Sequence, residues 1–115
     1  MQQQFPFSQA LTANQLGFNP LTTWQNEQPE RPSEVTVLVR ATTTGVRLTA
    51  YAGNRLLQER TPVQGGGTAG TTPSPLNTTP FTFLCNAYEK LKLSFDEVAG
   101  GTPTVDGLVV IEYIG

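Results

Sequence analysis

The chain has 115 residues and a formal net charge of −2, with seven Lys and Arg, nine Asp and Glu, and no histidine. This length predicts one domain, and the lack of histidine excludes Ser-His-Asp and Cys-His nucleophilic sites. The few basic residues are scattered among the carboxylates, so the sequence does not favour specific binding to nucleic acid, which requires a basic face.

Residues 1–33 are predicted to form an extended N-terminal arm that packs on another surface. The segment is rich in Gln, Asn and Pro, and Pro20, Pro29 and Pro32 prevent a long helix. Its aromatic content argues against the alternative of a disordered tail, because disordered segments are poor in aromatic residues. We expect the contacts of the arm to be made by Phe5, Phe7, Phe18 and Trp24.

Residues 34–115 are predicted to form an all-β domain, an antiparallel β-sandwich resembling a jelly roll. EVTVLVRA, GVRLTAYA and RLLQER have the alternation of a three-stranded meander, and PFTFLC and EKLKLSFDEV predict two more strands. Asp106-Gly107 separates TPTV from LVVIEYI, and Asp-Gly between two β-rich runs indicates a hairpin turn. Short strands with a turn every eight to twelve residues, roughly, are typical of this class.

A long connector, QGGGTAGTTPSPLNTTP, follows the third predicted strand and has no charged residue. Loops of this length are usually functional or disordered. Gly65, Gly66 and Gly67 predict a flexible hinge, and the prolines after it predict a stiffer contact segment. We expect that segment to contact a partner through Thr72, Pro73, Pro75 and Leu76, and an ordinary surface loop is the alternative.

No catalytic, cofactor-binding or metal-binding residue is predicted. Asp96 and Glu97 are adjacent, so on a strand their side chains point to opposite faces, and a solvated strand end is the expected environment. Asp106 and Glu112 have no spacing that pairs them with either carboxylate. The run of three glycines lacks the Lys-Ser/Thr of a phosphate-binding loop. Cys85 lies in the apolar run FTFLC, where a free cysteine is usually a small buried side chain.

Neither a membrane span nor a signal peptide is predicted. No apolar run approaches the ~20 residues that cross a bilayer. The start MQQQFPFSQ has neither a basic region nor an apolar one. We expect no membrane partner.

Tyr51 is expected to be exposed, because it alternates to the face opposite Val46 and Leu48. An exposed aromatic ring on a sandwich can stack on a sugar or anchor a protein interface. The sequence therefore leaves two classes of function open, a binding surface for a protein and a carbohydrate-binding or adhesion module.

The segment from Val35 to Phe95 resembles small β-rich structural proteins of tailed-phage virions, the capsid cement or decoration class. The likeness lies in the hairpin RATTTGVRLTAY, the Gly/Thr/Pro connector and the following strand EKLKL. It implies a protein without enzymatic activity that binds the lattice of a major capsid protein. It further implies a homo-oligomer, with a trimer favoured, that is made in the host cytoplasm and is located on the capsid surface of the virion.

Overall fold

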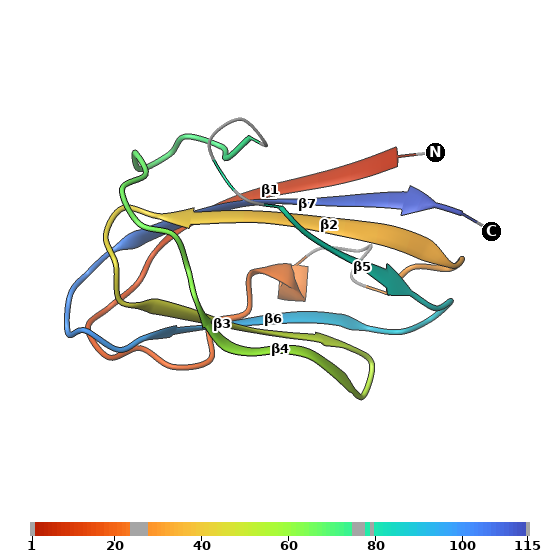
Figure 1. The fold of residues 1–115 in the computed structure, drawn as a ribbon, viewed down its shortest axis with the longest axis horizontal. Coiled ribbons are helices and arrows are strands. Elements are labelled where there is room, and N and C mark those ends of the chain that lie inside the picture. The colour runs from red at the N-terminus through yellow and green to blue at the C-terminus, as the bar shows by residue number, and fades with distance from the viewer. Residues whose placement is uncertain (1, 24–27, 75–77, 79, 115) are drawn as a thin grey trace.

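The computed structural model describes residues 2–23, 28–74, 78 and 80–114. These residues form seven strands in two antiparallel sheets without an α-helix (Figure 1). The four-stranded sheet has the order β1-β7-β2-β5 and the three-stranded sheet the order β4-β3-β6. The elements are β1 (Gln2–Ala10), the 3-10 helix η1 (Pro20–Thr23), β2 (Ser33–Ala41), β3 (Val46–Ala52), β4 (Arg55–Pro62), β5 (Phe81–Cys85), β6 (Leu91–Glu97) and β7 (Thr104–Tyr113).

The two sheets share one hydrophobic core, and the predicted all-β antiparallel class is confirmed. Alternation places every second side chain of a strand inward. Val35 and Val37 of β2 therefore meet the inward side chains Leu48 and Ala50 of β3, and all four are buried in one cluster. Phe95 of β6 is its largest fully buried side chain. Burial of one large apolar side chain contributes ~1.5–3 kcal/mol, so this cluster is the main source of stability.

The N-terminal segment differs from the predicted arm, because residues 2–10 are a strand of the four-stranded sheet. Strand β1 pairs with β7 along its whole length, from Gln2 opposite Glu112 to Ala10 opposite Thr104. Phe5 and Phe7 pack against the core, and Gln4 and Pro6, which alternate with them, are exposed. Proline is tolerated on an edge strand, where its missing N–H faces away from the ladder. The high Gln and Pro content concealed this strand in the sequence.

The predicted turn at Asp106-Gly107 is wrong, since β7 runs without interruption through both residues. Gly107 lies opposite Phe7 on one side and Val39 on the other. A Cβ atom at this position would overlap the Phe7 ring. Glycine is therefore needed here for the close approach of an aromatic ring to the backbone, and Asp106 beside it is buried.

The connector between β4 and β5 carries the chain from the three-stranded sheet to the four-stranded one, and Figure 1 shows its described residues before 75 passing over the outer side of the latter. Its first half is fastened to the end of β2, because Ala41 N donates to Gln64 O at 2.9 Å and Gly67 N donates to Ala41 O at 2.9 Å. A Cβ atom on Gly65 would lie 2.8 Å from Thr44 N. These glycines permit close packing in place of the predicted free hinge.

Cys85 is buried, as its apolar surroundings predicted. Burial disfavours the thiolate and raises the pKa of the Cys85 thiol to about 11. The described residues include no helix that is long and apolar enough to cross a bilayer.

Candidate functional site

Three of the predicted contact residues, Phe5, Phe7 and Phe18, come together on the flank formed by the edge strands β1 and β6. The Phe5 and Phe7 ring centroids are 6.4 Å apart, and Phe7 and Phe18 both lie against Phe95, at 5.9 and 6.5 Å. Beside these rings is a groove of about 280 Å³. We call it the aromatic groove, and its lining includes Phe5, Phe7, Ser8, Gln9, Phe18 and Thr22.

Phe18 is held in this groove by backbone pairing with β6. Its N–H donates to Phe95 O at 3.0 Å, and Phe95 N donates back to Phe18 O at 2.9 Å. Gly17 N donates to Asp96 Oδ1 at 2.8 Å, and Leu21 in η1 is buried. The loop between β1 and β2 is thereby attached to the edge of the three-stranded sheet, so the wall that carries Phe18 is preformed.

Glu97 fixes the neighbouring turn of the same loop. Its carboxylate accepts hydrogen bonds from Asn14 N at 2.9 Å, Ala99 N at 3.0 Å and Gly100 N at 2.8 Å. The bond from Asn14 N–H is the main reason that the pKa of Glu97 lies below its usual range, and burial opposes the shift. The expected solvated strand end is wrong for Glu97, whose exposed fraction is 1%. The residue organises two loops, and these contacts give it no acid–base partner.

The second predicted contact, the connector, forms a separate and more polar surface. Thr72 is exposed and Pro73 is buried, and both line a small pocket of about 120 Å³ with Arg40 and Asp106. Gly70 N donates to Asp106 Oδ1 at 3.1 Å, which ties the connector to β7. None of the described residues lines both this pocket and the aromatic groove. Three predicted contact residues lie outside the described residues, namely Trp24, Pro75 and Leu76.

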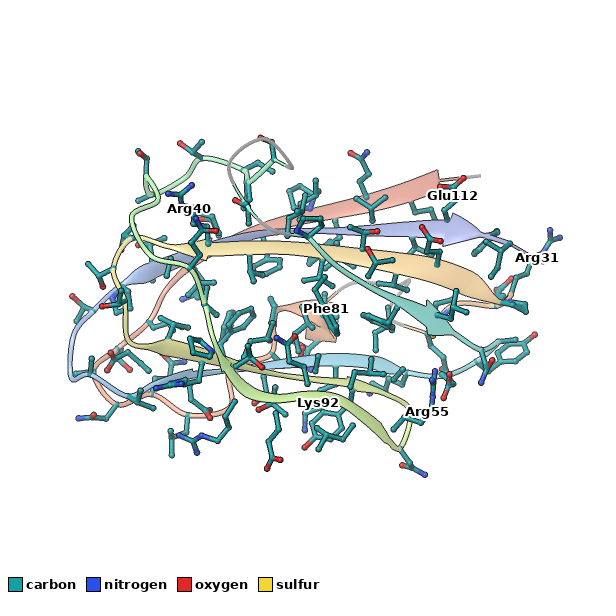
Figure 2. The ribbon with its side chains drawn as sticks, viewed as in Figure 1. Arg31, Arg40, Arg55, Phe81, Lys92 and Glu112 are labelled. Carbon is teal, nitrogen blue, oxygen red and sulfur yellow. The ribbon has the colours of Figure 1, made fainter. Side chains whose placement is uncertain are left out.

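Tyr51 is half-buried on the outer side of the three-stranded sheet, away from both sites. The Lys92 ammonium lies 5.6 Å from the centre of its ring, a favourable cation–π distance. Figure 2 shows Lys92 on this side of the molecule. Tyr51 therefore lies on a different surface from Phe5, Phe7 and Phe18.

A larger pocket, which the sequence did not indicate, lies on the opposite flank between the edge strands β4 and β5. It has a volume of about 510 Å³, and its walls include Val37, Val39, Leu48, Gln58 and Phe81. We call it the open-flank pocket. These residues come from four strands of both sheets, so their proximity depends on the topology and on no local motif.

The flank of the open-flank pocket is also bridged by an ion pair. Arg55 of β4 donates from Nε and Nη2 to the two oxygens of Glu89, at 3.0 and 2.5 Å, and from Nη2 to Leu84 O at 2.9 Å. The hydrogen bonds from Arg55 hold the pKa of Glu89 below its usual range. This bidentate pair, with Arg55 exposed and Glu89 half-buried, joins β4 to the loop that follows β5.

Within the described part of the chain, no three His, Cys, Asp or Glu side chains are grouped so as to hold a metal ion. No family model and no curated protein matches the sequence.

Proposed function

We propose that this chain is a non-catalytic structural protein of a virus particle, which binds the lattice of a major capsid protein as a cement or decoration protein. The aromatic groove is the observation that carries this proposal. Aromatic side chains in a preformed depression are the groups that usually dominate the energy of a protein interface. The groove fits an apolar side chain or a short segment of the partner.

The order of the strands supports a jelly-roll origin for the fold. An eight-stranded jelly roll has its first, eighth, third and sixth strands in one sheet and its second, seventh, fourth and fifth in the other. The orders β1-β7-β2-β5 and β6-β3-β4 match this scheme with the second strand missing. The Phe18–Phe95 bridge lies beside β6, where that missing strand would pair. Viral capsid proteins and lectins both use jelly rolls, and this support is by analogy.

The rim of the aromatic groove suits a tightly packed lattice. Ser8, Gln9, Asn19 and Thr22 line it with hydroxyl and amide groups and carry no charge. Such groups can form hydrogen bonds across an interface without the cost of desolvating an ion. In this proposal the N-terminal segment contacts the lattice as one wall of the aromatic groove, with β1 paired to β7 in place of a free arm.

The proposal is tested by placing a large charged side chain at the rim of the aromatic groove. Ser8→Arg is expected to lower binding to capsids at least about tenfold, because the guanidinium would be desolvated against an apolar partner surface. Asn54→Arg, at the exposed β3–β4 turn, adds the same charge elsewhere and is expected to bind normally. Binding is measured by cosedimentation with capsids assembled without this protein from the genes of the virus that encodes it. Absence of the unmodified protein from those particles would refute the proposal.

A carbohydrate-binding or adhesion module is the second candidate, supported by the half-exposed ring of Tyr51 beside Lys92. This function predicts glycan binding by a monomer. A glycan array with the unmodified protein and with Tyr51→Ala separates the two functions, since lattice binding through the aromatic groove does not require Tyr51.

A further inference from the structure

The uncovered end of the outer side of the four-stranded sheet presents a row of three exposed residues. Leu84, Glu34 and Glu112 are lateral neighbours on β5, β2 and β7. Leu84 is 59% exposed, and both carboxylates are exposed. Glu34 and Glu112 form no ion pair with a described residue. Like charges directly opposite each other destabilise a sheet, so this pair would be relieved by a cationic partner.

The outer side of the three-stranded sheet presents a matching row of opposite charge. Leu56, Tyr51 and Lys92 are lateral neighbours on β4, β3 and β6. Leu56 is 50% exposed, and the Lys92 ammonium lies over the Tyr51 ring. Figure 2 shows Glu112 and Lys92 on opposite sides of the molecule. Each sheet therefore presents an exposed leucine on the edge strand β5 or β4. It also presents a charged residue two strands away, Glu112 on β7 or Lys92 on β6.

The two rows are at the same end and in the same order. Arg55 Nη2 of β4 reaches Leu84 O of β5 at 2.9 Å, so these two edge strands lie on one flank. From that flank the strands follow as β5, β2, β7 in one sheet and β4, β3, β6 in the other. Strands are spaced by ~4.8 Å in any sheet. Two copies stacked along the sheet normal, with the rotation of about 30° that packed sheets show, can therefore bring Leu84 to Leu56, Glu34 to Tyr51 and Glu112 to Lys92 in the same order.

We propose that copies of this chain stack front to back, with the Leu84–Glu34–Glu112 row of one copy seated on the Leu56–Tyr51–Lys92 row of the next. The contact pairs two leucines and sets both carboxylates against the Lys92–Tyr51 pair, which is the complementarity that selects a second copy as the occupant. Because two different surfaces meet, the stack closes into a ring or continues as a filament. The inference does not rest on the proposed function, since stacking needs no capsid.

The rest of the outer side of the four-stranded sheet is not available to a second copy. Leu38 points outward from β2 yet is only 2% exposed. Arg40 on the same strand contacts Gly66 O of the connector through Nη2 at 3.4 Å. Arg31 stacks on the ring of Tyr113, which alternates to the side opposite Glu112, and Arg55 is paired with Glu89. The end of the sheet near Leu38 and Arg40 is therefore covered by the connector, whereas the end near Glu34 and Glu112 is open to a partner.

The experiment is sedimentation velocity of the full chain over a range of concentrations at low ionic strength. We expect association that weakens with added salt. Glu112→Lys and Lys92→Glu are each expected to weaken it about tenfold or more, because each places like charges in contact. The double variant carrying both changes restores opposite charges and is expected to regain association. An equimolar mixture of the two single variants is also expected to associate, because each variant supplies the charge opposite to the one that the other has changed.

Glu30→Lys is the matched control, since it makes the same charge change at an exposed position outside the strands. It is expected to associate like the unmodified chain. A protein that stays monomeric at all concentrations would overturn the proposal, as would association that Glu112→Lys leaves unchanged. Neither result bears on the aromatic groove, because Ser8 and the capsid-binding test involve other residues.

Discussion

The two flanks of the molecule close the gap between the sheets in different ways. On the β1–β6 flank, the rings of Phe7 and Phe18 lie against the buried ring of Phe95, and the Glu97 carboxylate fastens the adjoining loops. On the β4–β5 flank, the Arg55–Glu89 pair bridges the edges, and a pocket of about 510 Å³ remains between them. Stability should therefore be concentrated on the first flank, and tolerance of substitution on the second.

The largest effect is expected from Phe95→Ala. Phe95 is fully buried and contacts two other rings, so its truncation should cost about 4 kcal/mol of unfolding free energy. Phe81→Ala, at the partly buried wall of the open-flank pocket, should cost less than half as much. Urea denaturation followed by circular dichroism measures both. Equal losses would mean that the two flanks contribute alike.

A smaller effect with a distinct pH dependence is expected from Glu97→Gln. The folded pKa of Glu97 lies below its unfolded value of ~4.3, so its stabilisation is complete above that value. It is lost as the pH falls from there through the folded pKa. The variant should be less stable at neutral pH and should lack this part of the acid dependence.

Denaturation curves between neutral and strongly acidic pH provide the measurement for Glu97→Gln. Glu59→Gln, at an exposed position of β4, is its control. An acid dependence that is the same in the Glu97 variant as in the unmodified chain would contradict a role for the ionised carboxylate.

The smallest effect should have opposite signs at two positions of the four-stranded sheet, one at the open flank and one in its centre. Val39→Phe places extra volume at the wall of the open-flank pocket and should stabilise the protein by about 1 kcal/mol. Val109→Phe makes the same change on the inner side of the same sheet, where Val109 is fully buried, and should destabilise it by ~1–3 kcal/mol. Thermal unfolding distinguishes them, and destabilisation by both would show that the pocket cannot accept a ring.

The sequence predicted the strands that correspond to β2, β3, β4, β5 and β6. The predicted meander of the first three is wrong, because β2 lies in the four-stranded sheet while β3 and β4 lie in the other. The prediction also failed where a residue serves a distant contact. Gly107 has the sequence context of a turn because its neighbour is aspartate, yet its role is to admit the Phe7 ring. Strand β1 was missed for a related reason, since its partner β7 lies at the other end of the described chain.

The candidate site was predictable only in part. The aromatic content of the first segment pointed to Phe5, Phe7 and Phe18 as contact residues, and the structure brings these three together in one groove. The open-flank pocket and the two complementary rows depend on strand order and cross-strand register. Neither of these can be read from local periodicity, because strands of the same pattern can be arranged in many orders.

The pairing of β1 with β7 also determines when the fold can be completed during synthesis. Translation proceeds at ~5–20 residues per second, so about 5 s or more separate the emergence of these two strands from the ribosome. The three-stranded sheet β4-β3-β6 needs only residues 46–97 and can form first. Until β7 follows, Phe5 and Phe7 have no ladder to join and remain available to chaperones or to other nascent chains.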